Sequence, residues 1–345
     1  MVEGILKELL LQQNYLEGEP INTIYLGGGT PSLLNRSDLS LILETIRSTQ
    51  TVNSPEITLE ANPDDLTLTK LEELLQVGVN RLSIGIQSFH PSQLTFLHRA
   101  HDASTALECV HHARTVGFKN ISMDLIYAIP GESEAMWIED IQQAIDLKPE
   151  HLSCYSLTIE EKTVFGRWSA AGKIKTVEDE ISARHLEILM DELCQVGYEH
   201  YEISNFALPG FYSKHNSSYW KQEKYLGVGP SAHSFNGKSR QFNIANNHLY
   251  LKALQQGIVP CEKEELSPEN KINEYILTTL RTSWGTDLQK LKTELGHDLL
   301  AKNSDYLSKI INNDLVTLKA DKLRLTQKGK LLADKISSDL FVMNV

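Results

Sequence analysis

The chain has 345 residues, a length that suits one large α/β domain with a smaller domain attached to it. Hydrophobic residues make up 41% of the chain and charged residues 23%, which excludes a disordered or fibrous protein. The net charge of −12 argues against broad, non-specific binding to nucleic acid, and no apolar run approaches the roughly 18–20 residues of a membrane span.

Short β-rich runs alternate with helical runs up to about residue 200. We predict a first helix over residues 5–16 and another that starts near Leu68 and ends at a Gly78 cap. Asp102 begins the next helix, which ends before Gly117. The predicted strands comprise residues 23–26, 56–60, 81–87, 121–128 and 151–157. A strand returns after about thirty residues, as in βαβ units, so we expect a parallel sheet with helices outside it, either a barrel or an open sheet.

Two further regions with different amino-acid composition follow in the chain. Residues 206–260 are rich in Gly, Asn, Ser, His and aromatic residues and show little periodicity, which is typical of a long functional segment. After Leu266 we predict helices over 271–280, 287–295 and 304–312, strands over 315–319 and 322–325, and a last helix. This order is that of a winged-helix domain. We therefore expect three regions: 1–205, 206–265 and 266–345.

A winged-helix domain either binds DNA or serves as a packing module. From Thr286 onward, the chain contains ten Lys and Arg and eight Asp and Glu, so its charge is nearly balanced. The helix over 304–312 contains only one basic residue, Lys309. Contacts to DNA phosphates need clustered basic residues. The sequence therefore favours the packing module.

Polar residues recur at the ends of successive predicted strands. Glycines and Thr30 follow the first strand, Glu60 ends the second, Gln87 ends the third and Asp124 lies in the fourth. Strand ends of a parallel sheet meet at one edge, where such folds bind ligands. A carboxylate there can hold ribose hydroxyls, and the fork of Arg99 can hold a carboxylate. Any one of these residues could be an ordinary loop residue, but together they favour a shared pocket.

Five motifs in this part of the chain carry a family resemblance: GGGTPS (27–32), EANP (60–63), GIQSF (85–89), RAH (99–101) and DLIY (124–127). In order and spacing they resemble the radical S-adenosylmethionine (SAM) proteins of the coproporphyrinogen III oxidase-like group, and most closely the heme chaperone HemW family. That resemblance implies a partial (β/α)6 barrel that holds SAM on a [4Fe–4S] cluster. It also implies that SAM meets a set of cofactor-binding residues: Gly28, Gly29 and Thr30 at its amino acid end, Glu60, Gln87 and Asp124 near its ribose, and Arg99 at its carboxylate.

The family carries a CxxxCxxC motif just after its first strand, and this sequence contains no such motif. Its cysteines, Cys109, Cys154, Cys194 and Cys261, lie more than thirty residues apart, which is typical of unpaired thiols in a reducing compartment. We expect Cys109 and Cys154 to be buried structural thiols. A shortened chain or a misplaced start codon explains the missing motif and first strand most simply, and a natural cluster-free relative is the alternative. Residues 23–26 would then be an exposed sheet edge.

A second set of candidate residues lies in HNSSYW (215–220). The imidazole of His215 can ligate iron, while Tyr219 and Trp220 offer faces to a porphyrin, and Lys214, Lys221 or Lys224 can meet propionates. Alternatively, His215 anchors a loop and the aromatic residues are packing. The HNxxYW segment matches the one that the resembled family associates with heme, so the resemblance implies cofactor-binding roles for His215, Asn216, Tyr219 and Trp220, with His215 as the metal ligand.

Together with these patterns, the resemblance implies a HemW-like, cytoplasmic heme-binding chaperone that delivers heme to heme proteins and binds no nucleic acid. The fold expected is a partial radical SAM barrel without its first strand, followed by the winged-helix-like domain. An oxygen-independent coproporphyrinogen III oxidase-like enzyme and a cluster-free heme-binding module are the alternatives. Because the cluster cysteines are absent, we expect this chain by itself to be inactive in radical chemistry.

Overall fold

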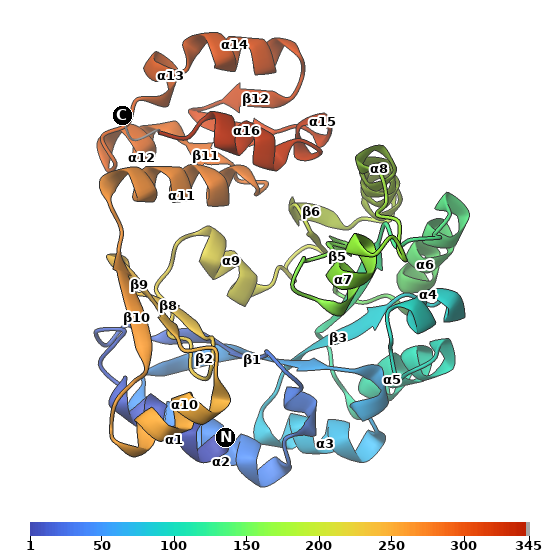
Figure 1. Ribbon diagram of the computed structural model, residues 1–345, viewed down its shortest axis with the longest axis vertical. Helices are drawn as coiled ribbons and strands as arrows, with labels where there is room; N and C mark the ends of the chain where they lie inside the picture. The colour runs from blue at the N-terminus through green and yellow to red at the C-terminus, as the bar shows by residue number, and fades with distance from the viewer. Residues whose placement is uncertain (343–345) are drawn as a thin grey trace. The chain divides into compact units, whose positions relative to one another are not determined.

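The computed structural model describes residues 1–342, which divide into two compact units (Figure 1). One unit contains Met1–Tyr25, Leu34–Ile57 and the chain from Lys214 onward. The other contains Leu26–Leu33 and Thr58–Ser213. The last three residues of the expected 266–345 domain lie outside the described residues, and the expected three-region division stays a prediction.

Seven strands form the main sheet in the order β1-β2-β3-β4-β5-β7-β6. Strands β2 to β5 run parallel, whereas β7 and β6 are antiparallel additions at one end. Each of the five predicted strands is present, and β1 is the terminal strand, as predicted. The bounds are β1 (Ile21–Leu26), β2 (Val52–Ala61), β3 (Arg81–Gln87), β4 (Ile121–Tyr127), β5 (His151–Ser156), β6 (Glu199–Glu202) and β7 (Asn205–Ala207).

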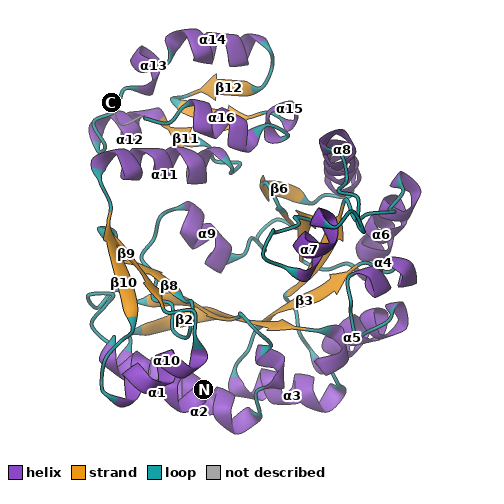
Figure 2. Ribbon diagram, viewed as in Figure 1, coloured by secondary structure: helices purple, strands orange, loops and turns teal. Residues whose placement is uncertain are grey.

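Helices connect the parallel strands and cover the outer side of the sheet, where Figure 2 shows α3, α5 and α6. Local signals fix their ends: Asp102 accepts a hydrogen bond from the N–H of Thr105, and Gly78 and Gly117 are left-handed caps. The helices are α2 (Arg36–Thr49), α3 (Leu68–Val77), α4 (Pro91–Phe96), α5 (Ala103–Val116), α6 (Glu134–Leu147), α7 (Val164–Ala170) and α8 (Asp179–Gln195). The predicted α/β architecture is confirmed. Within residues 1–342, no helix combines the length and the apolar character needed to cross a bilayer.

Helix α1 (Val2–Leu11) is shorter than the predicted helix over 5–16 and is organised around one buried carboxylate. Glu8 accepts hydrogen bonds from the Gln12 amide (2.8 Å), the Gly229 N–H (2.9 Å), the Asn243 amide (2.6 Å) and the Tyr250 hydroxyl (2.5 Å). A buried charge is tolerated when donors surround it in this way. The carboxylate therefore ties the first helix to residues more than two hundred positions later.

The region over 206–260 is more regular than its sequence indicated. It contains α9 (Lys214–Trp220), α10 (Asn247–Gln255) and a three-stranded antiparallel sheet of β8 (His233–Phe235), β9 (Ser239–Asn243) and, extending to residue 265, β10 (Cys261–Glu265). The buried face of β9 consists of Ser239, Gln241 and Asn243. Gln241 and Asn243 donate to Gln12 and Glu8 of the α1 segment. Strand β9 was not predicted because its buried side chains are polar, so hydrophobic alternation does not mark the strand.

The C-terminal domain follows the predicted order of elements. Its bounds are α11 (Pro268–Leu280), β11 (Thr286–Asp287), α12 (Leu288–Thr293), α13 (Leu299–Lys302), α14 (Ser304–Asn312), β12 (Val316–Lys319), β13 (Lys322–Leu325), α15 (Gln327–Lys330) and α16 (Ala333–Asp339). Ala320 and Asp321 both have positive φ, which forms the tight hairpin between β12 and β13. A separate apolar cluster, with Ile276, Leu280 and Leu291 fully buried, forms the core of this domain.

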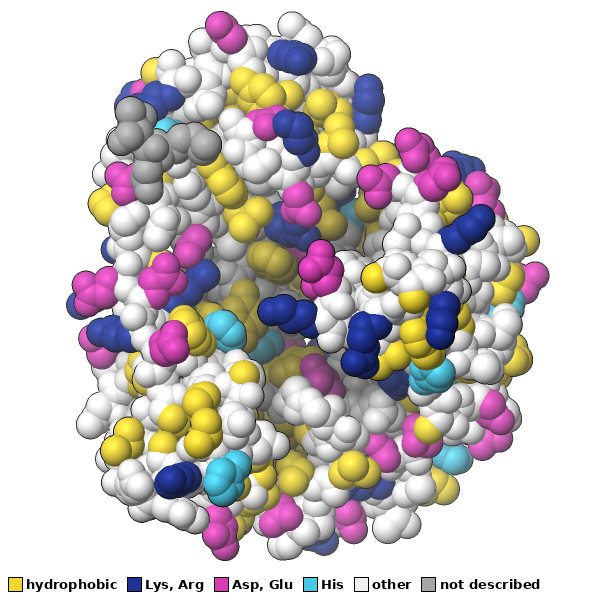
Figure 3. All heavy atoms as spheres, in the orientation of Figure 1, with side chains coloured by type: hydrophobic (Ala, Val, Ile, Leu, Met, Phe, Trp, Pro, Cys, Tyr) yellow, Lys and Arg dark blue, Asp and Glu magenta, His cyan; other side chains and the backbone are white. Residues whose placement is uncertain are grey.

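Charge on this domain is mixed. Figure 3 shows basic and acidic side chains interspersed on the face that it presents. Several bases are also paired with acids, including Lys322 with Asp287 (2.7 Å) and Lys335 with Asp339 (2.6 Å). Helix α14 itself carries one base, Lys309, and one acid, Asp305.

We predict that the full chain does not bind duplex DNA at physiological salt. Specific and non-specific DNA binding both draw on several lysine and arginine contacts to phosphates, and α14 supplies only one base. Fluorescence anisotropy of a labelled duplex should stay constant as the protein is added. Tight binding that weakens steeply with added salt would contradict the assignment of this domain to packing.

Candidate functional site

A pocket opens at the carboxyl edge of the parallel strands, with a volume of about 220 Å³. Six of the seven residues predicted for SAM line it, which are Gly29, Thr30, Glu60, Gln87, Arg99 and Asp124. The lining also includes Pro31, Ser32, Ala61, Asn62, Ser83 and Gly85. We call this cavity the strand-end pocket. It forms because β2, β3 and β4 are parallel neighbours, so their ends meet although they lie far apart in the sequence.

The glycine turn after β1 forms one wall of this pocket. Gly28 and Gly29 have φ values of +70° and +86°, a backbone region that favours glycine. The N–H of Gly28 donates to a carboxylate oxygen of Glu60 at 3.1 Å. This contact connects Gly28, the seventh predicted residue, to the pocket. The turn then leads into a short 3-10 helix (Pro31–Leu33), whose Ser32 donates to Asp65 at 2.6 Å.

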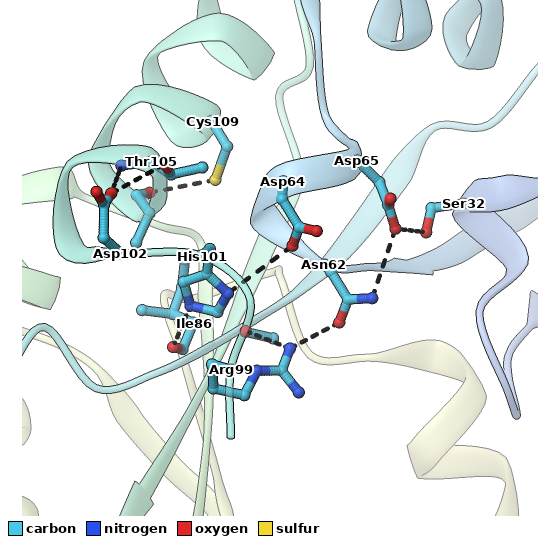
Figure 4. Close-up of polar contacts among 12 residues, drawn as sticks. Ser32, Asn62, Asp64, Asp65, Ile86, Arg99, His101, Asp102, Thr105 and Cys109 are labelled. Carbon is cyan, nitrogen blue, oxygen red and sulfur yellow. Dashed lines mark hydrogen bonds and ion pairs between the residues drawn. The ribbon is translucent and has the colours of Figure 1, made fainter. Parts of the chain in front are cut away.

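Arg99 lines the pocket and points toward Asn62 (Figure 4). Its Nη2 donates to the side-chain oxygen of Asn62 at 2.6 Å and to the carbonyl of Gly85 at 3.3 Å. Its Nε is buried and has no hydrogen-bond acceptor among the described residues. Burial also lowers the pKa of the Arg99 guanidinium. A buried donor of this kind is satisfied when a ligand supplies an acceptor, and a carboxylate is the natural partner.

Asp124 is a pocket residue whose carboxyl pKa is shifted far from its ordinary value. The pKa of its carboxyl is raised to about 6, chiefly by burial and also by the nearby charge of Glu60, although hydrogen bonds from Ser153 and Ser83 act to lower it. The two Ser83 contacts measure 3.2 and 3.3 Å. Carboxyl groups that are desolvated and close to a like charge cluster at ligand and catalytic sites.

Sequence reasoning assigned no role to Asn62, Ser83 or Gly85. Asn62 follows β2 directly and orients Arg99, so its position after a strand could have indicated it. A Cβ at Gly85 would lie 2.7 Å from the Gln87 amide and 3.4 Å from the Arg99 guanidinium, so a side chain there would displace the ends of two pocket side chains. This proximity appears only in three dimensions.

His101, from the same motif as Arg99, has a supporting role (Figure 4). It is buried, its Nε2 lies 3.1 Å from the carbonyl of Ile86, and its Nδ1 lies 3.9 Å from a carboxylate oxygen of Asp64. Burial lowers the pKa of the imidazole. His101 thus ties the segment after α4 to the end of β3.

The HNSSYW segment forms α9 in the other compact unit. His215 stacks on Tyr25 of β1, with ring centroids 4.3 Å apart, and meets Tyr219 edge-on at 4.9 Å. Tyr219 is 37% exposed and contacts Tyr225, at 4.6 Å between centroids. Asn216 is half-buried on the same helix. The segment therefore places an imidazole and a partly exposed aromatic face side by side.

The remaining aromatic residue of α9 is linked to the C-terminal domain. The Arg281 guanidinium lies 5.9 Å from the centre of the Trp220 ring, and Lys221 lies 6.0 Å from that of Trp284. The indole N–H of Trp220 is buried without an acceptor among the described residues. Of the lysines proposed for propionates, Lys224 instead pairs with Glu17 (2.8 Å) and Glu19 (2.6 Å), while Lys214 is exposed.

The cysteines do not converge. Cys109 and Cys154 are buried, as predicted, and burial raises the pKa of the Cys109 thiol to about 12. Cys194 and Cys261 are exposed. In residues 1–342, no group of three or more His, Cys, Asp or Glu side chains is arranged to hold a metal ion. The described residues therefore do not fit a [4Fe–4S] cluster.

Two family models match the chain. The radical SAM superfamily model matches residues 3–144, which include the strand-end pocket, and the HemN C-terminal domain model matches residues 266–332. The second match coincides with the winged-helix-like domain.

Curated relatives match almost the whole chain. The heme chaperone HemW of Lactococcus lactis is 34% identical over 97% of this chain and 88% of its own length. HemW of Bacillus subtilis is 34% identical over 92% of this chain and 85% of its own length. HemW of Mycobacterium tuberculosis is 30% identical over 95% of this chain and 83% of its own length.

A solved structure has the same fold. Coproporphyrinogen III oxidase (HemN) from Escherichia coli, described as a radical SAM enzyme, aligns with a TM-score of 0.84. The alignment covers 99% of this chain and 82% of HemN, at 22% sequence identity. At that identity the likeness establishes the fold, and it confirms the α/β half-barrel with an attached C-terminal domain.

We predict that Asp124→Asn stabilises the free protein above about pH 6. The folded chain holds the Asp124 proton more tightly than the unfolded chain, so the stability from this group is present below about pH 4 and is lost as pH rises to about 6. At pH 7 the variant should unfold with a free energy higher by on the order of 1–2 kcal/mol. Urea denaturation from pH 4 to 8 measures this. Asp191→Asn, on the exposed side of α8, is the control, and a pH-independent gain in Asp124→Asn would contradict the explanation.

We also predict that the 345-residue chain assembles no [4Fe–4S] cluster. Reconstitution with iron and sulfide should give no brown colour, and reduction with dithionite in the presence of SAM should give no 5′-deoxyadenosine, because three thiolates must converge on a cluster. A chain extended upstream by a strand with CxxxCxxC is the positive control. Cluster assembly by the 345 residues alone would require the separated cysteines to meet in space.

Proposed function

Because the chain belongs to the HemW family of radical SAM proteins, we propose that it binds heme and passes it to heme-requiring proteins. The observation that carries the proposal is α9, where the His215 imidazole is held beside the partly exposed ring of Tyr219. An imidazole nitrogen is a common axial ligand of heme iron, and aromatic faces pack against porphyrins. The wide spacing of the four cysteines in the sequence fits a reducing, cytoplasmic location.

The residues of α9 fit heme as a group. Heme would supply an iron that accepts a nitrogen ligand, and this chain would supply the imidazole of His215. Tyr219 and Trp220 would cover the porphyrin. The buried indole N–H of Trp220 could donate a hydrogen bond to the ligand. Asn216 would complete the contact, and the exposed Lys214 has a charge that suits a propionate.

For the strand-end pocket we propose SAM as the ligand. The glycine turn and Thr30 would hold the amino acid end, and the unsatisfied Nε of Arg99 would meet the SAM carboxylate. Glu60, Gln87 and Asp124 would hold the ribose. In radical SAM proteins a reduced cluster supplies the electron for SAM cleavage. The described residues would bind and orient SAM but would not supply that electron.

Porphyrin oxidation remains the less favoured alternative. The HemN structure shares this fold, but fold alone does not carry function. The HNxxYW segment and the similarity to several HemW proteins over most of the chain favour the chaperone.

We predict that His215→Ala weakens hemin binding by more than about ten-fold and shifts the Soret band, because it removes the proposed iron ligand. Titration with hemin, followed by absorbance, measures both. His248→Ala, an exposed histidine on α10, controls for surface imidazoles that capture hemin. Equal spectra and affinities for His215→Ala and the unaltered protein would remove His215 as a ligand.

A further inference from the structure

His215 is held by residues that lie far from it in the sequence. Its Nδ1 lies 3.4 Å from the hydroxyl of Thr23, and its ring stacks on Tyr25 with an interplanar angle of 16°. Its backbone N–H donates to a carboxylate oxygen of Glu56 at 3.1 Å. All four residues belong to one compact unit. None of the three supporting residues belongs to a motif that the sequence analysis singled out.

The strand places the first two supports on the same face. Thr23 and Tyr25 are two positions apart in β1, so their side chains point to one side, while the intervening Ile24 is buried on the other. Glu56, on β2, is 7% exposed. Thr23 thus meets a ring nitrogen, Tyr25 meets a ring face, and Glu56 fixes the backbone at the start of α9.

The contact to Thr23 bears on the protonation of the ring. A neutral imidazole carries its proton on one nitrogen and a lone pair on the other, and the hydrogen bond made by one nitrogen sets the state of the other. When Nδ1 donates to the Thr23 hydroxyl, the lone pair lies on Nε2. Metal-bound histidines commonly donate their second N–H to a fixed acceptor, which sets the ring orientation and raises its basicity.

We propose that Thr23 and Tyr25 are positioning residues that present Nε2 of His215 as the iron-ligating atom. The Thr23 hydroxyl accepts a hydrogen bond from Nδ1–H, and Tyr25 prevents the ring from rotating about its Cβ–Cγ bond. The inference rests on the proposed heme function, since it names the atom and the supports that such a function uses. It extends the site from α9 to the edge strand of the main sheet.

The tautomer can be measured without heme. In protein labelled with ¹⁵N-histidine, long-range ¹H–¹⁵N correlation spectra distinguish the two tautomers, and the His215→Gln spectrum identifies the His215 signals. We expect the Nδ1–H form in the unaltered protein and a loss of that preference in Thr23→Val. Thr23→Ser keeps the hydroxyl and should retain it. A predominant Nε2–H form in the unaltered protein would overturn the proposal.

The heme-loaded protein gives a second readout. Thr23→Val should bind hemin about ten-fold to a hundred-fold more weakly, as is typical when a hydrogen-bond partner of a ligating histidine is lost. Its reduction potential should rise, because a less basic imidazole stabilises ferric iron less, and Thr23→Ser should restore both values. A purely structural role for Thr23 would leave the potential unchanged.

The two proposals can fail separately. If His215→Ala leaves hemin binding unchanged, the proposed function fails at this helix, and the assignment of Nε2 fails with it. If His215→Ala abolishes the Soret shift while Thr23→Val matches the unaltered protein in tautomer and potential, only the role of Thr23 is wrong.

Discussion

The parallel alignment of β2 to β5 is the constraint on which the strand-end pocket depends. Parallel neighbours bring the carboxyl ends of their strands to one edge, and the polar residues that follow each strand gather there. This arrangement has an energetic cost. Glu60 and Asp124 come close enough for the charge of one to raise the pKa of the other, and Gln87 takes a positive φ at a break in strand register. A ligand with complementary charge would stabilise a pocket that holds this strain and charge.

Two kinds of buried polar group can be distinguished in this protein. Glu8 receives donors from four different residues and needs nothing further, so its role is to hold α1 to the segments around Gly229 and β9. The Nε of Arg99 and the indole N–H of Trp220 are buried without acceptors among the described residues. Leaving a buried donor unsatisfied costs about 1–3 kcal/mol, so an acceptor on a bound ligand would stabilise either group. Both belong to the sets of residues that the family resemblance implied.

The strand-end pocket and helix α9 belong to different compact units. The strand-end pocket has a glycine turn, carboxylates and a guanidinium, which suit a zwitterionic ligand with hydroxyl groups. Helix α9 has an imidazole, aromatic rings and a nearby lysine, which suit a flat, apolar ligand with acidic edges. The two sets of side chains therefore differ in chemistry as much as in sequence position.

The sequence by itself determined the features that depend on local chemistry. Alternating β-rich and helical runs predicted the order of elements through β5, caps such as Asp102 and Gly117 fixed helix ends, and polar residues at strand ends predicted the residues that line one pocket. Tertiary structure decided the rest, because the decisive contacts join distant residues. Strand β9 escaped prediction since its buried face is polar and is satisfied by α1, and Lys224 pairs with Glu17, which sequence patterns do not reveal. The supports of His215 lie on β1 and β2, some 160 to 190 residues away, and only the folded chain brings Thr23, Tyr25 and Glu56 to that ring and its backbone.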